Sequence, residues 1–352
     1  MVFSGVIIKI PYLIVWKLKK HLNKLHQFVI YLDSYQDYKV FESVLPHLKI
    51  PYLICAKNRR VKNELRKHGV ESQCWPLWGQ TVLMARHALH KFPIKEIKKI
   101  GIRHGPYHFK DFISAVKYNA FDLYLFTSES ENRIALAKGI TVGQSGGYPG
   151  LDMLKSEQVL KQAEMIKTKL ANENRKLILF SATWSGSGMS AIHKWIYRIK
   201  ELATEYEIAV TVHPKMEKKY FQLLKSNKDI TIVDQKNLPV YMNASDFLIS
   251  DTSSIIAEYC ALDKPIITFK VESESKRLTD DIKKLICDIS IQVESFDDIR
   301  GALNCYEKKK DFKKDSREYY NRIMFDNVDI GHGKRCADII NSELMNMRTC
   351  PK

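Results

Sequence analysis

Short hydrophobic runs alternate with stretches of helical periodicity along the whole 352-residue chain. In the first half the runs are nearly continuous, which is typical of strands that are covered on both faces of a parallel sheet. Strands are predicted at residues 28–33, 52–56, 99–105, 123–128 and 140–146. Helices are predicted between them at 35–48, 59–68, 80–91, 109–119 and 129–138.

A polar, helix-prone segment interrupts this alternation at residues 151–175, and a second array follows it. The predicted strands of that array are 176–183, 207–214, 230–234, 246–251, 265–270 and 289–293, and the predicted helices are 191–206, 218–225, 254–262, 276–287 and 297–306. Two successive arrays predict an α/β fold with two doubly wound Rossmann-like domains that face each other across a cleft. The expected divisions are a first domain at 1–150, a linker at 151–175, a second domain at 176–310 and C-terminal helices at 311–352 that pack back across the cleft.

The net charge of +16 favours a polyanionic partner, because 56 Lys and Arg residues outnumber 40 Asp and Glu residues. Nucleic acid is not the expected partner, since the chain has no zinc-knuckle spacing, no aromatic RNA-binding signature and no arginine-rich arm. The seven cysteines are scattered and form no C-x-x-C pair. This distribution indicates a reducing compartment.

The N-terminal apolar segment, residues 2–16, contains Lys9 and Pro11 and is too short to span a bilayer. It fits two interpretations. One is a buried first strand and helix of the fold. The other is an interfacial anchor, with apolar side chains in lipid and the lysines that follow on acidic head groups.

Polar residues that directly follow predicted strands are the first candidates for a binding site, because parallel sheets bind ligands at the carboxyl ends of their strands. The chain contains neither G-x-G-x-x-G nor G-x-x-x-x-G-K-[ST]. His104 follows a strand and precedes Gly105-Pro106. It is either a hydrogen-bonded structural residue or a base for an acceptor hydroxyl. His213 is likewise either a strand cap or a donor to an oxyanion.

The stretch Asp251–Ser254 lies where a predicted strand passes into a helix. One of these residues is expected to cap the helix, but four exceed what a cap requires. Their hydroxyls and the free N–H groups of a helix start together predict a phosphate site. Glu258 lies one turn further on the same face and suits the hydroxyls of a ribose. Lys264 follows at the helix end, where it either contacts a substrate or satisfies the last carbonyls.

Several segments together resemble a known family. "TWSGSG", "VHPK", "SDTSSIIAEYCALDKPIITF" and "FDNVDIGHGKRCADII" occur in the order found in the CDP-glycerol glycerophosphotransferases of teichoic-acid and capsule synthesis. "RHGPYHFK" resembles a motif of that family's first domain, and the resemblance covers roughly residues 98–340. The chain departs from the pattern at Thr252, where the family has an aromatic residue, and at Ser185, where it has an arginine. Pro106-Tyr107-His108 and the extra Ile330 are further departures.

This resemblance implies a GT-B architecture without a bound metal or cofactor, in which the first domain takes the acceptor and the second a nucleotide-activated donor. It implies that His104 is the catalytic base and that His213 takes part in catalysis as a contact to the diphosphate. The implied donor-binding residues are Thr183, Trp184, Thr252, Ser253, Ser254, Glu258 and Lys264. The implied acceptor or phosphate contacts are Arg103, Lys110, Lys215, Asp329 and Arg335.

The expected function is the transfer of glycerol phosphate, or another polyol phosphate, from a CDP-activated donor to a membrane-linked acceptor in cell-surface polymer synthesis. Two alternatives stay open. One is a GT-B glycosyltransferase that uses a CMP-, UDP- or GDP-sugar for surface polysaccharide or lipopolysaccharide. The other is a basic nucleotide- or nucleic-acid-binding protein. The transferase is expected in the cytoplasm, on the inner face of the cell membrane, with an anionic membrane surface and a lipid-linked or polymeric anionic acceptor as partners.

Overall fold

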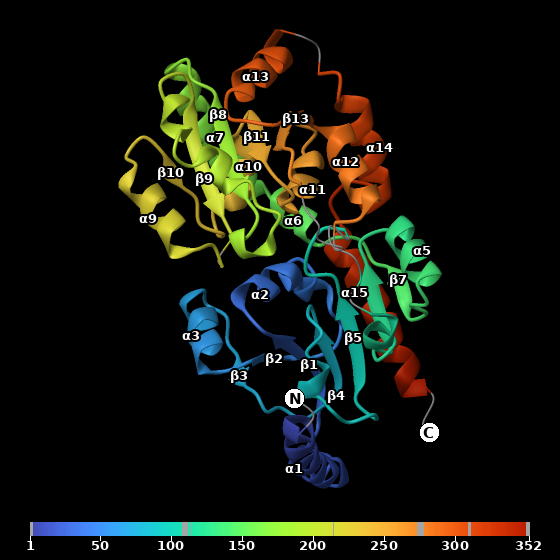
Figure 1. Ribbon diagram of the computed structural model, residues 1–352. Helices are drawn as coiled ribbons and strands as arrows, with labels where there is room; N and C mark the ends of the chain where they lie inside the picture. Colours follow the sequence, from blue (N-terminus) through green and yellow to red (C-terminus); the bar gives the residue numbers. More distant parts are fainter. Residues whose placement is uncertain are drawn as a thin grey trace. The chain divides into compact units, whose positions relative to one another are not determined.

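The structure is a computed structural model that describes residues 3–107, 112, 114–213, 215–272, 278–308 and 311–349. It divides into two compact units, each built on one parallel sheet (Figure 1). The first unit contains Met1–Gly105, Phe112–Asp152 and Gly331–Lys352, and the second contains Pro106–Asp111 and Met153–Ile330. The chain therefore returns to the first unit at its C-terminal end.

The first unit has a seven-stranded sheet in the order β3-β2-β1-β4-β5-β6-β7, and every pairing is parallel. Its strands are β1 (His26–Leu32), β2 (Leu53–Ala56), β3 (Gln73–Cys74), β4 (Gly79–Met84), β5 (Lys98–Ile102), β6 (Leu123–Phe126) and β7 (Gly143–Ser145). Its helices are α1 (Phe3–His21), α2 (Tyr35–Phe41), η1 (Leu45–His47), α3 (Arg59–Lys67), η2 (Leu89–Lys91), α4 (Ala115–Tyr118), α5 (Glu129–Ala137) and α15 (His332–Thr349); α6 (Gly150–Leu154) lies at the boundary between the units.

Two hydrophobic clusters cover the two faces of this sheet. Alternate residues of β1 divide between them: Phe28 and Ile30 belong to one cluster, and Val29 and Tyr31 to the other. Burial on both faces explains why the strand is apolar throughout.

Helix α15 packs on segments of the first unit that are distant from it in sequence. Its Asn341 accepts from the N–H of Lys49 at 3.0 Å and donates to the carbonyl of His47 at 2.9 Å. At its start, the carboxylate of Asp152 accepts from the N–H groups of residues 331, 332 and 333 at 2.7–3.1 Å. These contacts cap the helix and fix it to the first unit.

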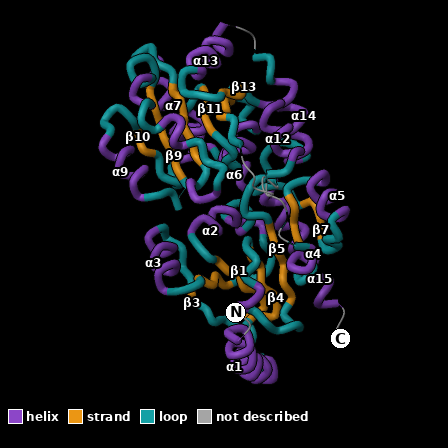
Figure 2. Tube along the Cα trace, in the orientation of Figure 1, coloured by secondary structure: helices purple, strands orange, loops and turns teal. Residues whose placement is uncertain are grey.

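The second unit has a six-stranded sheet in the order β10-β9-β8-β11-β12-β13, again parallel throughout. Its strands are β8 (Leu177–Ala182), β9 (Glu207–Val212), β10 (Thr231–Ile232), β11 (Phe247–Ser250), β12 (Ile266–Phe269) and β13 (Ile291–Val293). Its helices are α7 (Glu157–Asn172), η3 (Ser185–Ser187), α8 (Ile192–Trp195), η4 (Ile199–Glu201), α9 (Lys218–Ser226), α10 (Leu238–Ala244), α11 (Ile255–Cys260), α12 (Asp280–Ile289), α13 (Asp298–Lys308) and α14 (Lys314–Phe325). Helices lie on both faces of the strands, which are orange in Figure 2.

The divisions differ from the expected ones in two places. The expected linker forms α7, which packs against α10 of the second unit. The expected C-terminal segment separates into α14, which belongs to the second unit, and α15, which belongs to the first. Amphipathic periodicity identified these helices, but it does not show which sheet their apolar faces cover.

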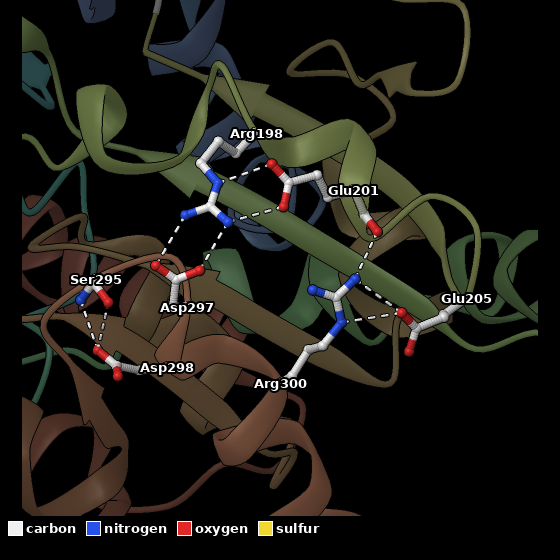
Figure 3. Close-up of polar contacts among 7 residues, drawn as sticks. All are labelled: Arg198, Glu201, Glu205, Ser295, Asp297, Asp298 and Arg300. Atoms are coloured by element: carbon white, nitrogen blue, oxygen red, sulfur yellow. Dashed lines mark hydrogen bonds and ion pairs between the residues drawn. The ribbon is translucent and has the colours of Figure 1, made fainter.

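Two arginines form ion-pair networks in the second unit, and the two networks differ in how deeply the arginine is buried. Arg317 in α14 is fully buried and binds Asp263 at 2.9 Å and Asp311 in the loop before α14. The side chain of Arg198 is 42% exposed and binds Glu201 in η4 and Asp297, the residue before α13, at 2.8–3.0 Å (Figure 3).

The sequence prediction was wrong for β4. The segment 80–91 has apolar residues at helical spacing and was expected to be a helix, but Gly79–Met84 is a strand between β1 and β5. Pairing on both sides and burial on both faces outweigh local propensity. The N-terminal segment was also only partly anticipated, because its described residues form one helix, α1, where a strand and a helix were one of the two expectations.

Among the described helices, none combines the length and hydrophobicity needed to cross a bilayer. Within the same described residues, no group of His, Cys, Asp and Glu side chains is arranged to hold a metal ion.

Replacing Arg317 with Ala should lower the free energy of unfolding much more than replacing Arg198 with Ala. Breaking a buried ion pair from one side costs about 3–5 kcal/mol, and we expect the lower end because both aspartates keep access to solvent. The Arg198 network lies in water, which screens it. Thermal melting of the two variants measures the difference, and equal losses would contradict this assignment.

Candidate functional site

The candidate donor site lies at the boundary between β8 and β11 in the second unit. From β8 the chain continues outward through β9 and β10, whereas β11, β12 and β13 lie on the other side. The connections therefore leave in opposite directions at this boundary, and doubly wound sheets bind their ligands at such a point, at the carboxyl ends of the strands.

Asp251, directly after β11, organises this boundary. Its carboxylate is buried and accepts from the N–H groups of Thr183 at 3.0 Å, Ala191 at 3.0 Å and Thr252 at 2.6 Å. Desolvation raises the pKa of Asp251, and these three hydrogen bonds act against that rise. Because Thr183 and Ala191 are the two ends of the loop after β8, one carboxylate fixes both ends of the loop.

The loop presents Trp184 at its surface. A Cβ atom on Gly186 would lie 2.7 Å from the indole, so the ring lies directly over that glycine. The ammonium of Lys215, from the end of β9, lies 5.7 Å from the ring centre. The structure therefore brings together two of the residues predicted from the sequence.

His213 is exposed at the end of β9. Its Nδ1 accepts from the backbone N–H of Lys215 at 3.0 Å. A neutral imidazole that accepts at Nδ1 carries its proton on Nε2. This tautomer makes His213 a hydrogen-bond donor, as the oxyanion role requires.

Of the three hydroxyl residues before α11, Thr252 bonds within the protein, whereas Ser253 and Ser254 keep access to solvent. Ser254 is the N-cap residue of α11, is exposed, and makes no side-chain capping bond to the helix. Ser253 beside it is partly exposed. Thr252 is buried and donates its hydroxyl to the carbonyl of Met189 at 3.0 Å. The hydroxyl proton of Thr252 therefore serves the loop, which does not favour its predicted role in the phosphate clamp.

Lys264 also has a structural task. Its ammonium donates to the carbonyls of Met242 at 3.2 Å, Ser245 at 2.8 Å and Asn243. These carbonyls close the C-terminal end of α10, so Lys264 caps α10 and not the helix that precedes it in the sequence. Desolvation, with a contribution from Lys167, lowers its pKa to about 8. Its three donors are occupied, which argues against the predicted contact with the donor. Glu258 lies partly exposed on α11.

The candidate acceptor site lies at the carboxyl edge of the first sheet, where His104 follows β5. The residue keeps access to solvent, but desolvation by the surrounding protein lowers the pKa of its imidazole to about 4. The charges of Arg86 and Arg103 act in the same direction, with a smaller contribution from His87, and a hydrogen bond with the backbone of Ala85 opposes them. His104 is therefore neutral near pH 7, as a base must be.

Arg103 is held in the interior of the first unit. Its guanidinium binds the fully buried carboxylate of Glu131 at 3.1 Å and the hydroxyl of Tyr118 at 3.2 Å. Glu131 in turn accepts from the N–H and the hydroxyl of Thr127. This geometry supports a positioning role beside His104 over the predicted direct contact with a phosphate.

The remaining predicted contacts are dispersed. Lys110 lies outside the described residues. Asp329 is exposed in the second unit, one residue before that unit ends at Ile330. Arg335 in α15 donates to the hydroxyl of Ser145 at 3.0 Å and so ties α15 to β7.

Sequence reasoning did not single out a second set of charges at the first sheet. Arg86 after β4 binds Asp37 of α2 at 2.7 Å, and Lys57 after β2 binds Asp33 at 2.9 Å. Asp33 was placed at the end of the predicted strand 28–33, but Arg86 lay inside a predicted helix. A strand assignment for 79–84 would have put Arg86 among the strand-end residues.

The chain belongs to the CDP-Glycerol:Poly(glycerophosphate) glycerophosphotransferase family, whose model matches residues 82–341. The resemblance found in the sequence is thereby confirmed. Teichoic acid ribitol-phosphate polymerase TarK of Staphylococcus aureus is 25% identical over 245 residues, which cover 64% of this chain and 46% of TarK. Teichoic acid poly(glycerol phosphate) polymerase of Bacillus spizizenii is 24% identical over 148 residues, 37% of this chain and 36% of that protein. The chain thus spans less than half the length of these relatives.

The fold is similar to that of the wall teichoic acid polymerase TagF. A TagF variant superposes with a TM-score of 0.70 at 14% identity, over 99% of both chains. A TagF variant soaked with CDPG gives 0.67 over 99% of this chain and all of the other. The predicted α/β fold class with two Rossmann-like sheets is confirmed.

Replacing Asp251 with Ala should destabilise the second unit and disorder the loop after β8. It leaves three N–H groups without their acceptor, and each unsatisfied group costs about 1–3 kcal/mol where water cannot replace it. Ser254→Ala is the matched control from the same turn and should melt like the wild type, since that side chain makes no capping bond. Similar melting temperatures for the two variants would contradict the organising role of Asp251.

Proposed function

We propose that this chain transfers a polyol phosphate from a CDP-activated polyol to an anionic, membrane-linked acceptor during synthesis of a cell-surface polymer. Membership of the glycerophosphotransferase family supports this function. Two of its relatives are named as polymerases of ribitol phosphate and of glycerol phosphate. The proposed donor class is therefore a CDP-polyol, with glycerol and ribitol as the two polyols to test.

The observation that carries the proposal is the hydrogen bonding of Asp251. It holds the loop after β8 and the start of α11 together at the point where a doubly wound sheet binds nucleotides. Trp184 and Lys215 at this point offer an aromatic face and a cation. Ser253, Ser254 and the Nε2–H of His213 offer donors to a diphosphate, and Glu258 an acceptor for ribose hydroxyls.

In the proposed reaction, an acceptor hydroxyl attacks the phosphorus that bears the polyol. His104 takes the hydroxyl proton as the O–P bond forms, and the bond between that phosphorus and the oxygen bridging to CMP breaks. CMP leaves with the bonding electron pair. His213 and the serine hydroxyls stabilise the negative charge on the diphosphate as the bond breaks. The reaction needs no cofactor.

His104→Ala should abolish turnover while donor binding persists. Purified protein is screened for thermal protection and turnover with CDP-glycerol, CDP-ribitol and CMP-, UDP- and GDP-sugars. Protection by a CDP-polyol alone supports the proposal, whereas turnover of a nucleotide sugar supports the glycosyltransferase alternative. His193→Ala, an exposed histidine of α8, is the control and should keep full activity. Loss of donor binding in His104→Ala would remove His104 from the role of base.

The acid limb of kcat/KM gives a further check on the base. The low pKa of His104 keeps the imidazole unprotonated well below pH 6.5, so kcat/KM should stay level from pH 7 to about pH 5 and fall as the pH approaches 4. A limb near pH 6.5 would contradict this environment for the base.

We also propose that α1 lies on an anionic membrane surface, at the inner face of the cell membrane. One face of α1 packs on the protein: Tyr12 donates to the carbonyl of Leu77 at 2.6 Å and Trp16 to that of Gly79 at 3.0 Å. The other carries a row of exposed apolar residues at a spacing of four, Ile10, Ile14 and Leu18, which Leu22 continues directly after the helix; the four are 50–61% exposed.

Basic residues border this row. Lys9, Lys17, Lys20 and Lys24 are all exposed. An apolar stripe between cations is the pattern of an interfacial helix, with the stripe among acyl chains and the lysines at acidic head groups. In this proposal each face of the helix corresponds to one of the two interpretations of the N-terminal segment.

The variant Ile14→Asp/Leu18→Asp should lose binding to vesicles of anionic lipid by about 100-fold, because two apolar side chains no longer enter the interface. Deletion of α1 would instead remove Tyr12 and Trp16 from the core. Val116→Asp/Leu136→Asp changes two exposed apolar residues elsewhere in the first unit and is the control. Equal vesicle binding of the two double variants would contradict the role of α1.

A further inference from the structure

The carboxyl edge of the first sheet holds an arginine that the proposed transfer does not use. Arg86 lies two residues after β4, and its side chain is 41% exposed. Strands β1 and β4 are neighbours, and the chain leaves them toward opposite edges of the sheet. Arg86 therefore stands at the ligand-binding position of the first unit, as Asp251 does in the second.

Asp37 fixes the orientation of this arginine. Its side chain is only 2% exposed, and one carboxylate oxygen accepts from Nε of Arg86 at 2.7 Å. The other oxygen accepts from the backbone N–H of Asp33 at 2.9 Å. A carboxylate held at both oxygens leaves the guanidinium little freedom to turn.

The two terminal nitrogens of Arg86 make no hydrogen bond or ion pair within the part of the chain that the structure describes. They form the edge of a planar fork whose donors match two oxygens of a phosphate. Lys57 is less suited to this task, because its ammonium is bound to Asp33 at 2.9 Å.

Arg86 also adjoins the proposed base. Strands β4 and β5 pair in parallel with Met84 opposite Gly101, so the residues that follow the two strands, Arg86 and His104 among them, lie side by side at the carboxyl edge. Of the charges acting on the imidazole of His104, that of Arg86 is the foremost. We propose that Arg86, oriented by Asp37, binds a phosphate of the acceptor beside the hydroxyl that His104 deprotonates. This inference rests on the proposed function and adds to it the side chain that binds a phosphate of the acceptor.

Binding of the acceptor then prepares the base. A phosphate on Arg86 cancels part of the positive charge that disfavours protonation of His104, while Arg103 keeps its partner Glu131 and His87 is unchanged. The affinity of His104 for a proton should therefore rise when a phosphodiester acceptor is bound. A neutral acceptor leaves this charge in place.

Arg86→Gln should raise KM for bis(glycerol) phosphate, a soluble diester acceptor, by roughly 10- to 100-fold, the loss expected for a charge-assisted fork. KM for the CDP-polyol and for glycerol as a neutral acceptor should not change. Arg86→Lys keeps the charge without the fork and should lie between. Arg60→Gln removes an equal charge from an exposed position on α3 and should behave like the wild type.

The pH dependence of kcat and kcat/KM is a second measurement, which would not change if Arg86 had only a structural role. In the wild type, the acid limb of kcat with saturating diester should lie at higher pH than that of kcat/KM, since kcat reports the complex and kcat/KM the free enzyme. In Arg86→Gln, the limb of kcat/KM should move up toward the ordinary histidine value.

Three outcomes overturn the inference: an unchanged diester KM in Arg86→Gln, equal losses for the donor and both acceptors, or coincident limbs in the wild type. The first leaves the proposed transfer intact.

If no CDP-polyol is turned over, the proposed function fails, and calorimetric titration with bis(glycerol) phosphate still tests the site. Binding by the wild type and by Arg60→Gln but not by Arg86→Gln supports it, and equal binding by all three rejects it. Melting curves of both Arg86 variants show whether the fold is kept.

Discussion

The buried carboxylate of Asp251 accepts hydrogen bonds from both ends of the loop after β8 and from the residue that begins the turn into α11. Carboxylates are costly to bury, so this one is stable only where several donors surround it. The shape of the loop, the placement of Trp184 and the exposure of Ser254 all depend on this contact. One acidic side chain thus sets the backbone conformation at the candidate donor site, where no glycine-rich loop is present.

In the first unit, buried carboxylates likewise fix the groups at the carboxyl ends of the strands. Parallel strands present their carboxyl ends along one edge, which brings His104, Arg86 and Asp33 together although they are far apart in sequence. Buried carboxylates again fix the cations: Glu131 holds Arg103, and Asp37 holds Arg86. In both units acidic residues position the functional groups, so a strongly basic protein depends on a few buried acids.

Much of the fold followed from hydrophobic patterning. The other principal strands were expected near their observed places because continuous apolar runs have few alternatives in a parallel sheet. Residues 79–84 were missed because their apolar positions fit a helix as well as a strand. Arg86 was missed for the same reason, because it counts as a strand-end residue only once β4 is recognised. The donor-binding roles predicted for Thr252 and Lys264 stay predictions. The sequence did not show that their polar groups also bind Met189 and the end of α10, because these partners are distant in sequence.

The sequence by itself determined the two α/β arrays, the family, and the strand-end positions of His104, His213 and Ser253–Ser254. These are local properties: periodicity, residue type and the order of motifs. Only the tertiary structure decided which polar groups face each other. It turned Thr252 inward, bound Lys264 to α10, and left the terminal nitrogens of Arg86 facing no partner among the described residues. Hydrogen-bond partners are set by the packing of whole elements, and no local pattern encodes that packing.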